Sequence, residues 1–486
     1  MKQDPVGIAD YFYDKSTNYY FDQADDSVGV RVYGKTAPYL GFEEGQPIGR
    51  DDMVNLLKGC DAAGKKIVQK HKVLCFSWAF SAPKSISMLA LMDGFELPRN
   101  MTRADITAAH DDAVLATMRE IEIRYSRARM GKGGQTQVDL STDNMVYSIL
   151  RDGFSREYDP HLSSHVLVFN ITQWEKNGAP HFSGIHGARF YFRDFPYLAT
   201  QFYMHELRAR LHRFDLKRSY MPHGQWRSDL VSHEAQEEFS TRQAQIRKAL
   251  LTTTNAKAAE MNTRRDKDPS RTKADILADW RRRLERIPTK SVDDIQAESK
   301  TRLLEWAQAN AGDCLEARHE LECNRRELGA CRRWQMIAER AVYRCATAWR
   351  ERMIVEYLVD MCRVGRPTHL SEAEERLDWA VSQKWIPVME MPTGRLHYST
   401  WSLMADERYV MDVFKRYRPK NLIPTVGGGN EKSSIQSDTS TKFTLYALWE
   451  VRPRDGACRR GSCGGPILHA ILVHLSEECL RSVLPY

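Results

Sequence analysis

The segment "SREYDPHLSSHVLVFN", residues 155–170, places two histidines at the start of an apolar run that is typical of a buried strand. In a strand, alternate side chains share one face and lie about 6.6 Å apart for each step of two residues. His161 and His165 would therefore stand roughly 13 Å apart, too far to hold one ion together. Ser163, which is placed to cooperate with His165, is a poor metal ligand. The segment predicts a strand entrance and leaves open a complete or reduced metal site.

The composition is that of a globular protein, with 42% hydrophobic and 28% charged residues in a chain of 486. Lys and Arg number 71 against 64 Asp and Glu, an excess too small to argue by itself for a polyanionic partner. No apolar run reaches the roughly 18 residues of a membrane helix, and the N-terminus lacks an apolar signal core. The ten cysteines form no CxxC pair, which disfavours a zinc ribbon or finger. We expect a cytoplasmic protein with reduced thiols and no membrane insertion.

Hydrophobic periodicity divides the chain into regions of different character. Apolar runs predict strands over 72–80 and 163–172. Helical spacing predicts helices over 102–130, which Thr102 can cap, and over 195–214. "GKGGQT", residues 131–136, predicts a flexible turn. From about residue 236 to 362 the pattern is almost wholly helical, with a basic cluster over 262–288. The residues after 425 are typical of a linker followed by a tail with no ordered domain.

Four tyrosines crowd the N-terminus: Tyr11, Tyr13, Tyr19 and Tyr20. One interpretation is aromatic packing of a terminal helix. The other is a set of nucleophiles, since a tyrosyl oxygen can attack a phosphodiester and hold one DNA end covalently. That chemistry requires a metal ion or a cation to offset the charge that develops on the phosphate.

"FSAPKSIS", residues 80–87, predicts a strand that ends in a turn. Such a turn would leave the Lys84 ammonium and the hydroxyls of Ser81 and Ser85 available to a phosphate. An ordinary surface turn is the alternative interpretation of the same residues.

Several of these stretches resemble, in order and spacing, the relaxase domain of the MobF, or TrwC-like, family of conjugative plasmid proteins. The resemblance covers residues 1–290, and its most specific strings are FSAPKS and SRxxDPxLxxH. The matching stretches are "ADYFYDKSTNYYFDQADD", "YGKTAPYLGF", "FSAPKSISMLAL", "AAHDDAV", "SREYDPHLSSHVLVFN" and "EEFSTRQAQI".

The resemblance implies an α+β fold: an antiparallel-sheet palm of the HUH-endonuclease kind, covered by helices and related to rolling-circle initiators. Family members nick one strand of a transfer origin with a tyrosine, keep the 5′ phosphate as a phosphotyrosine and later rejoin the strand. On this sequence the first nucleophile falls at Tyr11, and the second pair at Tyr19 and Tyr20.

The resemblance also implies a metal site held by three histidines. Here the three positions are occupied by Asp152, Ser163 and His165, and Ser77 stands where the family has an aspartate. Asp152 and His165 with waters suit a hard ion such as Mg²⁺ or Mn²⁺, held weakly. Lys84 and Arg156 are the groups expected to offset the phosphate charge, with Ser85 as a further phosphate contact.

We expect a relaxase palm over 1–235, a helical flap over 236–300, a helical linker with a partial helicase lobe over 301–424, and a disordered or truncated tail over 425–486. The helicase signature GxxxxGK[ST] is absent, so no ATPase activity is expected.

The predicted function is nicking and rejoining of single-stranded or hairpin DNA at a transfer origin, in the company of other conjugation proteins. One alternative is an inactive relaxase remnant that still binds single-stranded DNA. Another is a decaying gene in which no function is maintained.

Overall fold

The computed structural model describes residues 4–13, 29–69, 73–130, 138–190, 195–222, 225–251, 256–263, 270–343, 348–366, 368, 370–390 and 396–405. Tyr19, Tyr20, the turn at 131–136 and the tail at 425–486 lie outside these residues. The chain divides into two compact units, one made of residues 1–333 and 351–379 and the other of residues 334–350 and 380–486.

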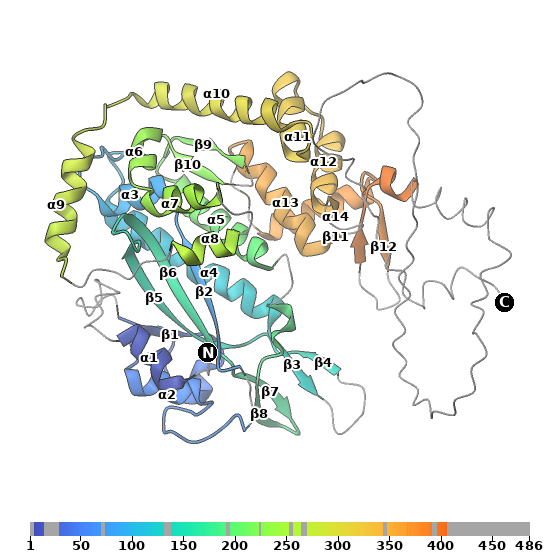
Figure 1. Cartoon of the computed structure of the whole chain (residues 1–486). Helices are drawn as coiled ribbons and strands as arrows, with labels where there is room; N and C mark the ends of the chain where they lie inside the picture. The colour runs from blue at the N-terminus through green and yellow to red at the C-terminus, as the bar shows by residue number, and fades with distance from the viewer. Residues whose placement is uncertain are drawn as a thin grey trace, which may run out of the picture. The chain divides into compact units, whose positions relative to one another are not determined.

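A four-stranded antiparallel sheet forms the centre of the first unit, in the order β1-β5-β6-β2. The strands are β1 (Arg31–Tyr33), β2 (Cys75–Ser81), β5 (Val146–Phe154) and β6 (Pro160–Phe169). Hairpin β5–β6 lies in the middle of the sheet and contains the turn at residues 155–159 (Figure 1). The predicted α+β class and the two predicted strands are confirmed, although β6 begins three residues before the predicted start. Pro160, the first residue of β6, belongs to the sheet because it pairs with Phe154 beyond a β-bulge.

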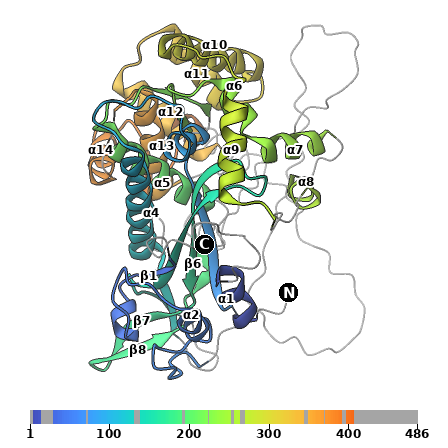
Figure 2. The same ribbon diagram turned by 90° about the vertical axis from the view of Figure 1, so that its left-hand side faces the viewer.

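Helices α3 (Lys84–Leu91), α4 (Arg103–Tyr125) and α5 (Phe195–His212) cover one face of this sheet (Figure 2). Thr102 caps α4 as the sequence predicts, because its hydroxyl accepts a hydrogen bond from the amide of Asp105 at 3.2 Å. The helix ends five residues earlier than predicted. The residues that follow it instead form a hairpin of β3 (Arg127–Met130) with β4 (Val138–Ser141).

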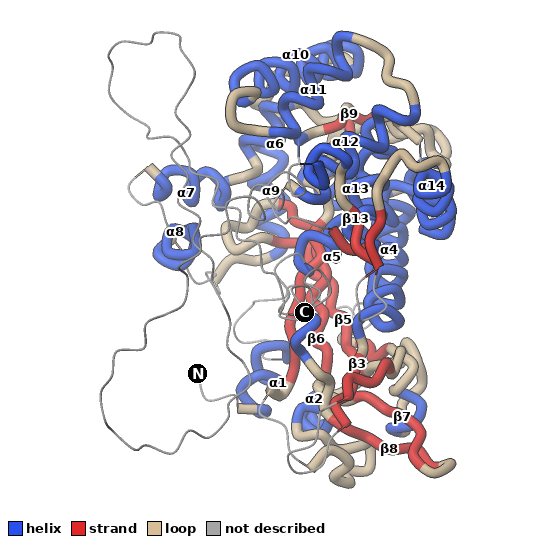
Figure 3. Tube along the Cα trace, turned by 90° about the vertical axis from the view of Figure 1, so that its right-hand side faces the viewer, coloured by secondary structure: helices blue, strands red, loops and turns tan. Residues whose placement is uncertain are grey.

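The opposite face of the sheet packs against α1 (Pro5–Tyr13) and α2 (Arg50–Leu57). Ala9 and Phe12 of α1 share a buried cluster with Leu150 of β5 and Leu167 of β6. Figure 3 shows hairpin β7–β8 (Thr172–Lys176 and Ala179–Ser183) beyond the end of the sheet at which α1 and α2 lie. The sheet is therefore covered on both faces, with the N-terminal helix on one and α3 to α5 on the other.

Helices dominate the remaining described part of the first unit, as the sequence predicts. They are α6 (His233–Glu238), α7 (Thr241–Leu250), α8 (Ala256–Asn262), α9 (Lys273–Leu284), α10 (Val292–Asn310), α11 (Leu315–Arg325), α13 (Arg350–Arg363) and α14 (Leu370–Ser382). The expected boundaries at residues 235 and 300 both fall inside helices, α6 and α10. Two short strands, β9 (Arg218–Tyr220) and β10 (Trp226–Ser228), pair with each other.

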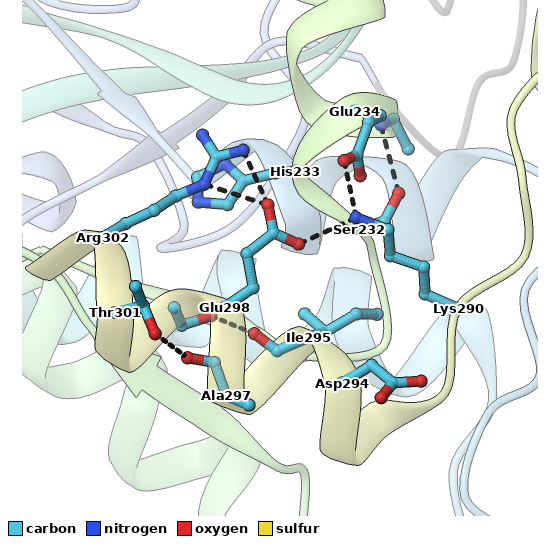
Figure 4. Close-up of polar contacts among 12 residues, drawn as sticks. Ser232, His233, Glu234, Lys290, Asp294, Ile295, Ala297, Glu298, Thr301 and Arg302 are labelled. Atoms are coloured by element: carbon cyan, nitrogen blue, oxygen red, sulfur yellow. Dashed lines mark hydrogen bonds and ion pairs between the residues drawn. The ribbon is translucent and has the colours of Figure 1, made fainter.

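A polar cluster ties α10 to α6 (Figure 4). The ammonium of Lys290 donates to Glu234 Oε1 at 2.6 Å and to Glu298 Oε2 at 2.9 Å. Arg302, one turn further along α10, donates to Glu298 Oε1 at 2.6 Å. These charge-assisted bonds join α10 and the residues before it to α6.

The second unit contains a three-stranded sheet in the order β11-β13-β12, made of Ala348–Trp349, Leu396–Tyr398 and Val388–Glu390. Helix α12 (Ala330–Val342) runs from the last residues of the first segment into this unit. Within the described part of the chain, none of the helices has the length and apolar character needed to cross a bilayer.

Candidate active site

A row of polar side chains crosses the three central strands of the sheet. Asp152 of β5 lies directly opposite Ser163 of β6, and Ser163 lies directly opposite Ser81 of β2. Directly opposed residues have Cβ atoms about 4.5–5.5 Å apart. His165 stands on the same face, two residues further along β6, because side chains alternate between the faces of a strand. The fold thus gathers the three predicted metal positions, Asp152, Ser163 and His165, at one place.

These donors do not fit a three-histidine metal site. Asp152 is 3% exposed, and its Oδ1 already accepts a hydrogen bond from the amide of Phe154 at 3.2 Å. Ser163 is also buried and supplies only a neutral hydroxyl. Among the residues that the structure describes, no three His, Cys, Asp or Glu side chains lie together as an ion would require. Of the three predicted metal positions, Asp152 and His165 are the two whose side chains suit a metal ion.

His161 lies on the same face of β6, and its Nε2 is 3.2 Å from the hydroxyl of Ser81. The ring therefore reaches across to strand β2. Ser77, also on β2, lies opposite Leu167 and has no carboxylate to orient a neighbouring ligand.

Lys84 is the first residue of α3, and its ammonium donates to the carbonyl of Pro160 at 2.8 Å. Burial lowers the pKa of Lys84 from its usual 10.5 to about 8; the nearby carboxylate of Asp159 opposes that shift and Arg283 adds to it. The side chain is still partly exposed. A cation is thus fixed at the entrance of β6, next to His161.

The predicted phosphate contact of Ser85 is wrong. Its side chain is fully buried, and its hydroxyl accepts a hydrogen bond from the amide of Ser228 at 2.9 Å. The residues after Pro83 form the first turn of α3 instead of an open turn, which directs Ser85 inward. Arg156, the other predicted cation, is partly exposed in the turn between β5 and β6.

The two described N-terminal tyrosines differ in their surroundings. Tyr13 donates from its hydroxyl to the carbonyl of Ile48 at 2.6 Å, and burial raises its pKa. Tyr11 is 42% exposed, with its ring at the edge of the Phe12 ring. An ion pair between Asp10 and Arg50 of 2.6 Å further attaches α1 to α2. Tyr13 therefore anchors the helix, and Tyr11 is presented at its surface.

Helix α1 packs on the same sheet face as the polar row. Phe12 shares its buried cluster with Leu150, and Leu150 lies directly opposite His165. The helix that carries Tyr11 therefore packs on the face of the sheet that also carries His165.

Sequence reasoning assigned no role to a buried network behind this site. His110 of α4 lies with its Nδ1 2.6 Å from the Tyr203 hydroxyl and its Nε2 2.8 Å from the Ser164 hydroxyl. Ser164 points away from the polar row, so the network holds β6 from the opposite face. The sequence signal for this network is His110 at a buried position of helix α4. Such histidines are common in protein cores, so the signal alone does not indicate a function.

The fold is an antiparallel-sheet palm of the relaxase type, with a tyrosine-bearing helix on the sheet face that carries the polar row. A family model described as TrwC relaxase matches residues 6–287, and the chain belongs to this family. The predicted family membership is confirmed.

Two relatives are multifunctional conjugation proteins TraI of Escherichia coli. One is 30% identical over 282 residues, which cover 54% of this chain and 15% of the relative. The other, from strain K12, is 31% identical over 174 residues, 35% of this chain and 9% of the relative. The chain thus corresponds to a small part of these relatives.

A copper-bound structure of the conjugative relaxase TrwC in complex with oriT DNA has the same fold, with a TM-score of 0.50 and 23% identity. The similarity covers 59% of this chain and 96% of that one. A metal-free structure of TrwC with oriT DNA has a TM-score of 0.49 at 23% identity, over 59% and 96% of the two chains.

Proposed function

We propose that this chain binds single-stranded or hairpin DNA of a plasmid transfer origin and nicks one strand by tyrosine transesterification. The observation that carries the proposal is the exposure of Tyr11 on a helix that packs against the sheet face of Asp152, Ser163 and His165. Strand transfer requires a nucleophile that the DNA can reach, and Tyr11 is exposed on a helix of that face.

The proposed step exchanges one phosphate ester for another. The Tyr11 oxygen attacks the phosphorus and loses its proton, the bond from phosphorus to the 3′ oxygen breaks, and the leaving strand gains a 3′ hydroxyl. The 5′ phosphate stays on the tyrosine, so no energy source is needed and the reverse reaction rejoins the strand. Tyr19 and Tyr20 are the candidates for a second transfer.

Lys84 and Arg156 supply the positive charge that the developing phosphate oxyanion needs. A hard ion such as Mg²⁺ or Mn²⁺ would have only Asp152 and His165 as protein ligands, with waters completing its shell. We therefore assign no step of the reaction to a metal.

A second candidate function is single-stranded DNA binding without nicking. The observation that favours it is the reduced donor set, since Ser163 supplies no imidazole and no three-ligand group is found within the described ranges. Both candidates require a DNA-binding surface, for which the basic helix α9 is the proposed backbone contact.

Binding is tested first, with labelled single-stranded oligonucleotides and unlabelled duplex as competitor. The expected logarithmic slope of affinity against salt is about −0.7 for each phosphate contact. Arg281 and Arg282 of α9 are 64% and 66% exposed, so R281A/R282A should reduce the magnitude of this slope by about 1.4. Arg326 serves as the matched control because it is 65% exposed and also paired to a carboxylate. Duplex competing equally well, or a slope near zero, would contradict the proposal.

A further inference from the structure

Residues of α7 and α9 contact the turn that joins β5 to β6, residues 155–159. Asp159, at its end, is 1% exposed and pairs with Arg283 of α9 at 3.0 Å between Oδ1 and Nη1. Its Oδ2 also accepts from the amide of Thr241, the first residue of α7, at 2.8 Å. A buried carboxylate is stable only when it is compensated in this way, so both helices are tied to the turn.

Arg283 is itself fixed by residues that precede α7. Its Nε donates to Glu238 Oε1 at 3.0 Å, and its guanidinium lies 4.3 Å from the centre of the Phe239 ring. Phe239 is fully buried. The stretch "EEFSTR", residues 237–242, and the stretch "SREYDP", residues 155–160, thus meet at one arginine that is distant from both in sequence.

Trp280 holds the same turn one helical turn earlier. Its indole nitrogen donates to the carbonyl of Tyr158 at 2.7 Å, and its ring lies 5.4 Å from the Phe154 ring. Tyr158 has a φ of +61°, a conformation that costs energy for a bulky residue and persists only where its surroundings enforce it. Trp280 therefore binds Tyr158 itself, and Arg283 binds Asp159, the residue directly after it.

The turn lies close to three residues of the candidate site, Asp152, Ser163 and Lys84. Asp152 and Ser163 are each within four residues of its ends, and Lys84 binds the carbonyl of Pro160 directly after it. We infer that Arg283 is a positioning residue of the relaxase site, which acts through Asp159 to fix the β5–β6 turn and so the pairing of Asp152 with Ser163. This inference rests on the proposed function for its catalytic consequence, but its structural part is independent.

Hydrogen exchange on the full chain tests the structural part. In Arg283→Gln, amides of residues 152–163 should exchange at least about tenfold faster, because breaking a buried ion pair leaves an uncompensated charge. Peptides of α4 should keep their rates. Arg282→Gln is the matched control, since Arg282 is the next residue of the same helix and pairs only at the surface with Asp279. Arg283→Lys should restore most of the protection.

The catalytic part is tested by DNA affinity and covalent adduct yield, with Arg326→Gln as the control because Arg326 lies outside the proposed DNA contact of α9. We expect the adduct to form about tenfold more slowly in Arg283→Gln, with affinity close to that of Arg326→Gln, since small misplacements reduce the rate of reaction more than binding. Unchanged exchange at 152–163, or equal acceleration in every peptide, would overturn the inference. If the natural chain forms no adduct, the proposed nicking fails, while the exchange comparison still decides whether Arg283 holds the turn.

Discussion

Asp152 of β5 lies directly opposite Ser163 of β6, so a carboxylate faces a hydroxyl where the family resemblance implies two histidines. His165 completes the row two residues further on. Asp152 and Ser163 are thus the two positions that lack a histidine, and because they are neighbours in the sheet, two substitutions can supply both imidazoles.

Replacing both residues, as D152H/S163H, should create a site for a transition-metal ion together with His165. We expect the affinity for Zn²⁺ or Ni²⁺ to rise by about two orders of magnitude or more, since imidazole suits these ions and single supporting contacts already contribute about 10- to 100-fold. Titration calorimetry measures the gain. The same variant with His165→Ala should lose it, and a folded D152H/S163H chain with no gain would show that the row does not converge.

The natural chain should bind Mn²⁺ weakly through Asp152 and His165. Calorimetry on the full chain beside His165→Ala measures this binding, and identical titrations of the two proteins would show that the remnant holds no ion.

Tyr11 and Tyr13 should respond differently to the same substitution. Tyr13→Phe removes the hydrogen bond to Ile48 and should lower the free energy of unfolding by about 1 kcal/mol, without loss of the DNA adduct. Tyr11→Phe should leave stability within about 0.5 kcal/mol and remove the adduct. Denaturant unfolding and adduct yield are measured for both variants. The opposite pattern would refute the assignment of Tyr11 as the nucleophile and Tyr13 as the anchor.

Lys84 should give a pH dependence in the alkaline range. Burial holds its pKa at about 8, below the usual 10.5, so in this window the unfolded chain binds the proton that the folded chain has lost. The stability of the natural chain relative to Lys84→Met should therefore rise between about pH 8 and pH 10. Unfolding free energies across that range measure the difference, and parallel curves for the two proteins would contradict it.

His110 should govern part of the acid sensitivity. Its complete burial, with Arg151 and His161 nearby, lowers its pKa from 6.5 to about 3, so its stabilising contribution is present above 6.5 and is lost as the pH falls toward 3. At about pH 5 the natural chain should lose about 2 kcal/mol relative to neutral pH, and His110→Gln should lose less. Equal losses in thermal or denaturant unfolding would exclude His110 as the cause.

The sequence predicted the elements whose signals are local. The cap at Thr102 and the apolar run of β6 are readable because neighbouring residues determine them. The early start of β6 at Pro160 was missed because it depends on pairing with Phe154 across a bulge. The exposure predicted for Ser85 was wrong because Pro83 was interpreted as part of a turn. The apolar residues after it instead belong to helix α3, which begins directly after Pro83 and buries Ser85.

The candidate site was predictable only where the family motif supplied it. Nothing in the local pattern connects Asp159 to Arg283, which lies 124 residues further along the chain. The difference between Tyr11 and Tyr13 is likewise tertiary, because it depends on the carbonyl of Ile48.

The most direct test of strand nicking by Tyr11 is capture of a covalent DNA adduct on the full chain. A pool of random single-stranded oligonucleotides labelled at the 3′ end is incubated with the protein and Mn²⁺, denatured, and the labelled protein is digested and mapped by mass spectrometry. We predict a nucleotide-modified peptide containing Tyr11, lost in Tyr11→Phe and retained in Tyr13→Phe. Intact binding of single-stranded DNA with no adduct on any tyrosine would contradict nicking and leave the chain as a DNA-binding relaxase remnant.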